Sequence, residues 1–300
     1  MSLTENLKGL LLPATTPFAA AGELELVALK QNLLRWSKKG ITGFIFLGST
    51  GERVHLNERE YLEVIAAGRA AVSSELAFIV GAGQQSTLGT ISEIAACAKV
   101  GADAVLVITP NFYRTAITQA TLISYYSAVA DASKVPVMLY SMPALTGIKI
   151  EPETIARLSQ HPNIVGVKDS SNDMDGLAET LKLCQPDFAI MTGNGTVLLD
   201  ALKRRATGAI LAVGCAVPEI CLDVMRLFES GEIDQAESLQ EKLTPFALAV
   251  TTRFGIGGLK FAMDLAGYQG GNVRAPLQMP GEEQRAEIER LLEVLKFETA

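Results

Sequence analysis

One lysine in the sequence stands where a buried strand is expected to end. Lys168 follows the apolar run 164–167, which places its amine at the tip of an otherwise buried strand. Burying a charged amine is costly, so we expect the pKa of Lys168 to fall well below the reference of about 10.4. A neutral lysine attacks carbonyl carbon, which predicts Schiff-base chemistry. The other interpretation is a structural salt bridge with Asp169 or Glu52.

Further polar side chains follow two other predicted strands. Tyr140 ends one of them, and a phenol there can exchange a proton with a substrate oxygen held above Lys168. General acid–base catalysis needs such a group within about 3 Å of the proton that it moves. Ser49 and Thr50 lie in a glycine-flanked turn whose backbone N–H groups can hold a carboxylate. Taken singly, a tyrosine at a strand end and a glycine-rich turn are also ordinary structural features. Glu52 is expected to anchor its loop rather than to do chemistry.

A repeated strand–helix pattern must position these residues. Short runs rich in Val, Ile, Leu, Phe and Ala recur along the chain, and their continuous apolarity is typical of parallel strands buried on both faces. The predicted strands are 10–15, 43–47, 77–81, 104–108, 135–140, 164–168, 188–192 and 208–212. Helical spacing lies between them, for example at 58–72, 87–100, 122–133, 152–159 and 177–184. Eight alternating units with right-handed crossovers predict an α/β fold, a closed (β/α)8 TIM barrel.

The ends of these segments carry the expected signals. Asn57 stands before acidic residues as a helix N-cap, Pro152 occupies a first helical position, and Gly101 follows a helix as its C-cap. Beyond residue 212 the pattern is purely helical. The helices predicted there are 218–229, 234–251, 259–265 and 282–295, with the glycines of 255–258 as a helix–helix connection. We expect a barrel body over 1–215, followed by the last barrel helix and a C-terminal helical extension over 216–300 in the same structural unit.

Composition argues against several other classes of protein. Of 300 residues, 26 are Lys or Arg and 33 are Asp or Glu, a net charge of −7, and this acidic balance argues against a nucleic-acid partner. No apolar stretch approaches the roughly 18 residues of a membrane span, and no secretory leader is expected. The turn 81–86 lacks the third glycine of a dinucleotide-binding motif. The four cysteines lack the spacing of metal ligands, and we expect reduced, mostly buried thiols. With only two histidines, no metal centre is expected.

Three of these segments together resemble the dihydrodipicolinate synthase / N-acetylneuraminate lyase superfamily. They are 48–52, 140–143 and 166–170, and the resemblance runs in order over nearly the whole chain. It implies a class I aldolase or related lyase on a (β/α)8 barrel with C-terminal helices, usually a homotetramer. It also implies that no metal or organic cofactor is required, because a covalent lysine imine with pyruvate carries the chemistry.

The resemblance assigns roles to individual residues. Lys168 would be the Schiff-base lysine for pyruvate or a pyruvate-yielding 2-oxo acid. Tyr140 would shuttle the proton, and Ser49 with Thr50 would hold the pyruvyl carboxylate and join the relay. The substrate-binding residues that the resemblance implies are Ser49, Thr50, Gly51, Ser170 and Gly193.

Departures from the family patterns bear on the substrate. Synthases carry an arginine for a second carboxylate where this chain has Leu145, and the loss of that partner weakens the synthase interpretation. Neuraminate lyases share the leucine, but they carry an Asp-Glu pair where 193–196 has no carboxylate. Many relatives place a tyrosine that reaches across a subunit interface where Phe112 stands. Either Tyr113 takes that role or the relay is shortened.

The closest likeness is to 4-hydroxy-2-oxoglutarate aldolases, through the segments 158–166 and 249–278. The sequence therefore predicts cleavage of a short 4-hydroxy-2-oxo acid, with 4-hydroxy-2-oxoglutarate as the best guess, to pyruvate and an aldehyde. The alternatives are a dihydrodipicolinate synthase using pyruvate and aspartate semialdehyde, and a 2-oxo sugar-acid aldolase or dehydratase. A non-catalytic 2-oxo acid binding protein is a further class, disfavoured by the intact Lys168 and Tyr140. We expect a cytoplasmic homotetramer that binds a small 2-oxo acid, with no nucleic-acid or membrane partner.

Overall fold

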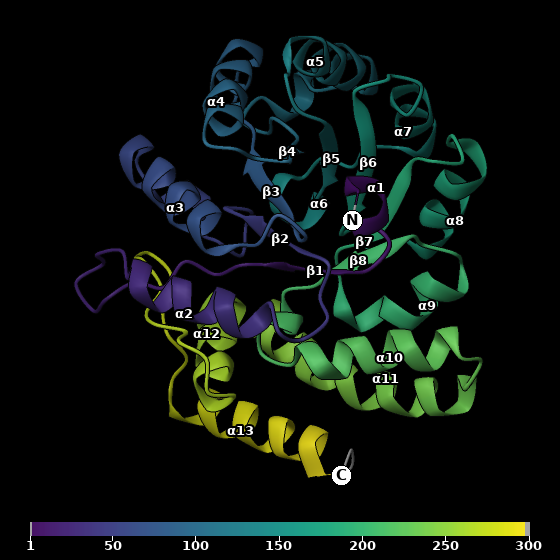
Figure 1. Ribbon diagram of the computed structural model, residues 1–300. Helices are drawn as coiled ribbons and strands as arrows, with labels where there is room; N and C mark the ends of the chain where they lie inside the picture. The colour runs from purple at the N-terminus through teal and green to yellow at the C-terminus, as the bar shows by residue number, and fades with distance from the viewer. Residues whose placement is uncertain (1, 298–300) are drawn as a thin grey trace.

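Eight parallel strands close into one barrel. The computed structural model describes residues 2–297, and its strands pair in chain order, with the last strand closing against the first (Figure 1). The strands are β1 Leu10–Pro13, β2 Gly43–Phe46, β3 Ala77–Ala82, β4 Ala104–Ile108, β5 Val137–Ser141, β6 Ile164–Asp169, β7 Ala189–Thr192 and β8 Gly208–Ile210. The predicted (β/α)8 barrel is confirmed, and every strand boundary lies within two residues of its expected place.

Helices alternate with the strands and cover the outside of the barrel (Figure 1). They are α2 Leu26–Trp36, α3 Glu58–Ala71, α4 Thr87–Lys99, α5 Gln119–Ala132, α7 Pro152–Leu158, α8 Met174–Leu183, α9 Leu198–Lys203 and α10 Pro218–Glu229. Asn57 is confirmed as an N-cap and Pro152 as a first helical residue, while Gly101, with a φ of +91°, directly follows Val100, the C-cap of α4. Two helices, α5 and α8, begin three residues earlier than predicted because Thr118 and Asp173 cap them.

Two apolar clusters explain why the strands are continuously apolar. One fills the barrel interior and includes Leu11, Met138 and Tyr140. The other lies between the strands and the surrounding helices. Helix α1 (Leu3–Asn6), which the sequence did not predict, lies at the end where the strands begin: the Asn6 amide donates to the Glu75 carbonyl just before β3. The segment before β1 therefore lies over that end of the barrel, and in a (β/α)8 barrel chemistry is expected at the opposite end.

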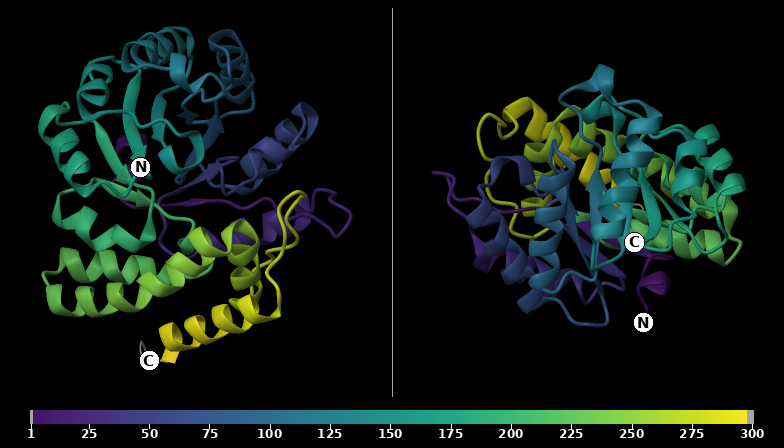
Figure 2. Two further views of the ribbon diagram at one scale, coloured as in Figure 1. Left: turned by 180° about the vertical axis from the view of Figure 1, so that it is seen from behind. Right: turned by 90° about the horizontal axis from the view of Figure 1, so that it is seen from above.

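The C-terminal helices pack along one side of the barrel (Figure 2). They are α11 Ile233–Ala247, a π-helical turn Leu248–Arg253, α12 Gly255–Leu265 and α13 Glu282–Phe297, with α11 against α9 and α10 and α13 against α11 and α12. The expected connection at 255–258 is wrong in part. Gly255 turns the chain with a φ of +57°, but Gly257 and Gly258 belong to α12. A Cβ on Gly257 would lie 2.2 Å from the Gln278 carbonyl oxygen, which explains the glycine there.

The cysteines agree with the expectation of reduced thiols. All four are free; Cys97, Cys215 and Cys221 are buried and Cys184 is half-buried. Burial raises the pKa of the Cys97 thiol to about 11, so this thiol is protonated at neutral pH. Among residues 2–297, no helix has both the length and the apolarity to cross a membrane.

Candidate active site

Lys168 ends up beside Tyr140, as the strand-end argument predicted. The two residues are register partners on β6 and β5, and the Lys168 amine lies 4.6 Å from the centroid of the Tyr140 ring. Lys168 is 5% exposed and Tyr140 is 4% exposed. Such a distance is within the range of a cation–π contact.

The alternative interpretation of Lys168 as a structural ion pair is wrong. Within residues 2–297, its amine forms no hydrogen bond or ion pair with any carboxylate. Both proposed partners are engaged elsewhere: Glu52 lies 2.6 Å from the Lys260 amine, and the Asp169 carboxylate accepts a 2.7 Å hydrogen bond from the Ser171 N–H. Burial raises the pKa of Asp169, and the hydrogen bonds from Ser171 oppose that rise.

The turn after β2 approaches Tyr140 from the opposite side of the barrel. The Ser49 hydroxyl lies 3.3 Å from the Tyr140 hydroxyl, and Thr50 is 7% exposed next to it. The Gly51 N–H donates to the Gly48 carbonyl at 3.1 Å, which closes the turn. A Cβ on Gly51 would lie 2.9 Å from the Leu47 backbone, so a side chain there would force the turn apart. Hydroxyls and backbone N–H groups of such a turn suit a carboxylate.

Ser170 and Gly193 complete the group of expected residues. A Cβ on Gly193 would lie 1.9 Å from the Ser170 hydroxyl oxygen and 2.9 Å from Cε of Lys168. Glycine at this position therefore lets the loops after β6 and β7 close on the lysine. The Gly193 N–H also donates to the Asp169 carbonyl at 2.6 Å, which fixes the two strand ends relative to one another.

The residues that depart from family patterns lie at the surface of the same end. Leu145, in α6 (Pro143–Thr146), is 59% exposed. Phe112 and Tyr113 are 75% and 71% exposed, with their rings edge to face at 5.1 Å. Arg114 packs beside α6, since a Cβ on Gly147 would lie 2.8 Å from its guanidinium. The structure thus places an aromatic pair at the surface, whereas Lys168 is buried.

Sequence reasoning missed one buried residue at this end, Lys260 in α12. Its residue surface is 0% exposed, and its amine bonds to Glu52, the residue that follows the Ser49–Gly51 turn. Glu52 is thus a loop anchor, as predicted. The available signal was a lysine within the predicted apolar helix 259–265, which a helical wheel alone would have assigned to its solvent face.

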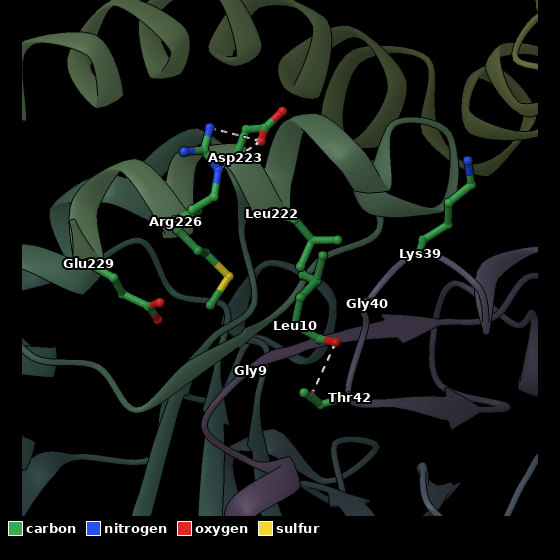
Figure 3. A pocket seen from close by; sticks show the side chains of 10 residues that line it. Gly9, Leu10, Lys39, Gly40, Thr42, Leu222, Asp223, Arg226 and Glu229 are labelled. Atoms are coloured by element: carbon green, nitrogen blue, oxygen red, sulfur yellow. Dashed lines mark hydrogen bonds and ion pairs between the residues drawn. The ribbon is translucent and has the colours of Figure 1, made fainter. Parts of the chain in front are cut away.

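A cavity of about 380 Å³ lies at the opposite end of the barrel (Figure 3). It is lined by residues from the starts of β1 and β2 and from α10, including Thr42, Asp223 and Arg226. The Arg226 guanidinium and the Asp223 carboxylate are paired with each other at 3.3 Å. None of the expected site residues lines this cavity, so it has no part in the chemistry around Lys168.

Comparison with known proteins decides the family. The model of the Dihydrodipicolinate synthetase family matches residues 6–295 of this chain. The chain belongs to this family. It is 32% identical over 288 residues to 4-hydroxy-tetrahydrodipicolinate synthase from Methanosphaerula palustris, covering 95% of this chain and 98% of that protein. The Thermodesulfovibrio yellowstonii enzyme of the same name is also 32% identical, over 96% of this chain and 97% of its own length.

Solved structures of family members agree with the fold. Dihydrodipicolinate synthase from Thermotoga maritima is 28% identical with a TM-score of 0.89, covering 95% of this chain and 97% of that one. A prophage protein of the family from E. coli K12, solved in complex with pyruvate, is also 28% identical with a TM-score of 0.89, over 96% and 98% of the two chains. As a member of this family, the chain is a carbon–carbon lyase of the class I aldolase type, and the expectation of lysine-imine chemistry without a metal or organic cofactor rests on that membership.

Proposed function

We propose that Lys168 forms a Schiff base with the keto carbon of pyruvate or of a pyruvate-yielding 2-oxo acid. The observation that carries this proposal is a buried amine without an ion-pair partner among residues 2–297, beside the Tyr140 ring at the carboxyl end of the barrel. The neutral amine adds to the keto carbon, and loss of water, with one proton supplied by the Tyr140 phenol, leaves an iminium ion. The related E. coli protein solved with pyruvate supports this choice of ligand.

In the cleavage direction, Tyr140 accepts the proton of the C4 hydroxyl while the C3–C4 bond breaks. The electron pair of that bond moves to C3 and into the iminium, which becomes an enamine, and the aldehyde leaves. The enamine then takes a proton at C3, and water hydrolyses the resulting iminium to release pyruvate and Lys168. Ser49, 3.3 Å from the Tyr140 hydroxyl, connects this proton to the turn that carries Thr50. Condensation follows the same steps in reverse.

The turn after β2 holds the pyruvyl carboxylate in this proposal. Ser49 and Thr50 offer hydroxyl groups, and Gly51 closes the turn that holds them through its N–H bond to the Gly48 carbonyl. Ser170 and Gly193 lie on the far side of the lysine and complete the binding site. This arrangement recognises the part of the substrate that all pyruvate-dependent members share.

For the second part of the substrate we propose a short 4-hydroxy-2-oxo acid, with 4-hydroxy-2-oxoglutarate as the first compound to test. Leu145 argues against the synthase reaction, because an exposed leucine stands where synthases bind a second carboxylate with arginine. The distal carboxylate of 4-hydroxy-2-oxoglutarate needs another cation, and Arg114 stands beside α6 on the same rim. This arginine is our candidate for that contact.

A second candidate is the condensation of pyruvate with aspartate semialdehyde. The relatives favour it, because the two proteins that are 32% identical to this chain are 4-hydroxy-tetrahydrodipicolinate synthases. Assays of the purified protein with 4-hydroxy-2-oxoglutarate, with pyruvate plus aspartate semialdehyde, and with N-acetylneuraminate separate the candidates. Our proposal expects turnover of the first compound to exceed the other two by at least about 100-fold in kcat/KM. A larger value for aspartate semialdehyde would assign the synthase reaction instead.

We also propose that the chain works as a homotetramer. Phe112 and Tyr113 form an exposed aromatic pair next to the site, and large exposed apolar groups are typical of contact surfaces. Light scattering coupled to size-exclusion chromatography measures the mass directly, and a Phe112→Ser/Tyr113→Ser variant is expected to shift it to smaller species. A monomeric mass for the unaltered protein at micromolar concentration would rule the tetramer out.

A further inference from the structure

The amine of Lys260 has a complete set of partners. It donates to Oε1 of Glu52 at 2.6 Å, to the Thr16 carbonyl at 2.7 Å and to the Asn272 carbonyl at 2.6 Å. An ammonium group has three N–H donors, so every one is used. The three acceptors belong to the loop after β1, the loop after β2 and the segment after α12. One fully buried side chain thus joins three separate parts of the chain.

The second carboxylate oxygen of Glu52 also has two partners. Oε2 accepts from the Arg274 backbone N–H at 3.0 Å and lies 3.1 Å from Nδ1 of His55. Its backbone has a φ of +53° and a ψ of 35°, the left-handed region. A residue other than glycine stays in that region where surrounding contacts fix it. Because Glu52 directly follows Gly51, these contacts also fix the end of the turn that carries Ser49 and Thr50.

Two more contacts tie the same turn to the C-terminal segment. The Thr16 hydroxyl donates to the Gly51 carbonyl at 2.7 Å, while the Thr16 carbonyl accepts from Lys260. The Arg274 guanidinium bonds to the His55 carbonyl and to both oxygens of Glu60 at 2.7 to 2.8 Å. The turn is therefore held by hydrogen bonds at the Gly51 carbonyl and at the Glu52 side chain. Both sets of bonds connect to Lys260, the first through Thr16 and the second directly.

We infer that Lys260, Glu52 and Arg274 form a positioning unit through which the segment 260–274 sets the affinity of the turn for the substrate carboxylate. None of the three is assigned a contact with substrate; they act through Ser49 and Thr50. This inference rests on the proposed function of the turn as the pyruvate carboxylate site. It predicts that loosening the unit weakens pyruvate binding more than it slows the chemistry at Lys168.

A purely structural role for Lys260 would give a different pattern. The buried pair would then contribute to folding, and its loss would lower stability without changing the concentration of pyruvate needed in the folded protein. Burial lowers the pKa of Lys260, and the Glu52 carboxylate opposes this, so the pair is electrostatically coupled in the folded state. Removing the amine leaves the carboxylate of Glu52 without its strongest partner, next to the turn.

The test uses Lys260→Met, which keeps the length of the aliphatic part of the side chain and removes the amine. The measured quantity is the pyruvate concentration that gives half-maximal borohydride trapping on Lys168, well below the unfolding temperature. We expect this concentration to rise at least 10-fold, with the trapping rate at saturating pyruvate within about 3-fold of the unaltered protein. Glu52→Gln, which keeps the shape of the side chain, is expected to raise the half-maximal pyruvate concentration about 5-fold. This variant replaces Lys260→Met in the test if Lys260→Met does not fold.

A matched control separates positioning from loss of stability. Leu227→Ala removes a buried side chain of α10 near the amino end of the barrel and destabilises the protein without touching the turn. Its half-maximal pyruvate concentration should stay within 2-fold of the unaltered protein. The inference is overturned if the half-maximal pyruvate concentration rises equally in Leu227→Ala, or if it does not rise in Lys260→Met and Glu52→Gln. In either case, trapping of pyruvate in the unaltered protein still supports the proposed function. Absence of trapping in the unaltered protein overturns both.

Discussion

Lys168 and Lys260 are two lysines with almost no exposed surface, and both lie at the end of the barrel where the strands finish. The Lys260 amine donates three hydrogen bonds, one of them to the Glu52 carboxylate. The Lys168 amine has the Tyr140 ring at 4.6 Å and, among residues 2–297, no hydrogen-bond acceptor. The protein therefore satisfies one buried amine completely and leaves the other without a partner.

The comparison shows what burial alone does not tell about a lysine. Three acceptors partly offset the cost of burying the Lys260 ammonium group, and a protonated amine has no lone pair with which to attack a carbonyl. A buried amine without acceptors loses its hydration and gains no hydrogen bond in return, and folding alone does not explain why a protein would keep such a group. Such uncompensated groups are characteristic of catalytic sites, where reactivity requires them. We therefore propose a structural and positioning role for Lys260, and we propose that Lys168 does the chemistry.

Replacing the unpaired lysine should affect activity far more than stability. We expect Lys168→Ala to lower turnover by at least about 10⁴-fold, because it removes the nucleophile. Its unfolding temperature should stay within about 4 °C of the unaltered protein, because no hydrogen bond or ion pair is lost. Steady-state assays and scanning calorimetry measure the two effects. Normal turnover in this variant would end the assignment.

Replacing the fully paired lysine should show the opposite balance. Lys260→Met strands the buried Glu52 carboxylate, and we expect the free energy of unfolding to fall by about 3 kcal/mol. Adding Glu52→Gln to the same chain removes the stranded charge, so the double variant should lose less than the sum of the two single variants. Urea unfolding curves give all three values. A loss below about 1 kcal/mol for Lys260→Met would contradict the comparison.

Tyr140→Phe separates proton transfer from imine formation at the unpaired lysine. We expect turnover to fall about 10³-fold, within the range for loss of a general acid–base group, while pyruvate can still be trapped on Lys168. Ser49→Ala should have a smaller effect because its hydroxyl acts through Tyr140. Equal turnover in Tyr140→Phe and the unaltered protein would remove Tyr140 from the mechanism.

Gly193→Ala tests whether the space around Lys168 is required. The added methyl group would lie 1.9 Å from the Ser170 hydroxyl oxygen and 2.9 Å from Cε of Lys168, so one of these side chains must move. We expect a fall in kcat/KM of about 10²-fold, the cost of misplacing a reacting group by about 1 Å. Gly281→Ala is the matched control, since nothing lies within 4 Å of its added methyl group. Similar activities of both variants would contradict this prediction.

The smallest expected effect concerns the ion pair between Arg274 and Glu60. Hydrogen bonds from Arg274 lower the pKa of Glu60 below its ordinary value of 4.5. A lowered folded-state pKa means that the pair stabilises the protein fully above pH 4.5 and loses that effect as the pH falls through the lower value. Glu60→Gln should therefore cost about 1 kcal/mol at pH 7, and the difference should shrink below pH 4.5. A difference that stays constant from pH 7 to pH 3 would contradict the assignment.

The two lysines also differ in how far the sequence predicts them. Lys168 was predictable because it ends an apolar run, and parallel strands bring their carboxyl ends together at one edge. The same rule correctly grouped Tyr140, Ser49 and Gly193, although they are far apart in the chain. The eight strands followed from the continuous apolarity that burial on both faces requires.

Lys260 was not predictable in this way because all its partners are distant. Glu52 lies 208 positions away and Thr16 lies 244 positions away, in loops whose paths no local pattern determines. Helix α1 escaped prediction for a related reason: it has four residues, too few to show a helical period. The proximity of Arg114 to α6 is likewise a product of two loops meeting.

The most direct test of the account is to locate the covalent adduct. The protein is incubated with pyruvate and borohydride, and mass spectrometry of its peptides identifies the modified residue. We predict one reduced pyruvyl adduct, on Lys168, that is lost in Lys168→Ala and kept in Lys260→Met. No adduct in the unaltered protein, or an equal adduct on Lys260 or in Lys168→Ala, would contradict the distinction between the two lysines.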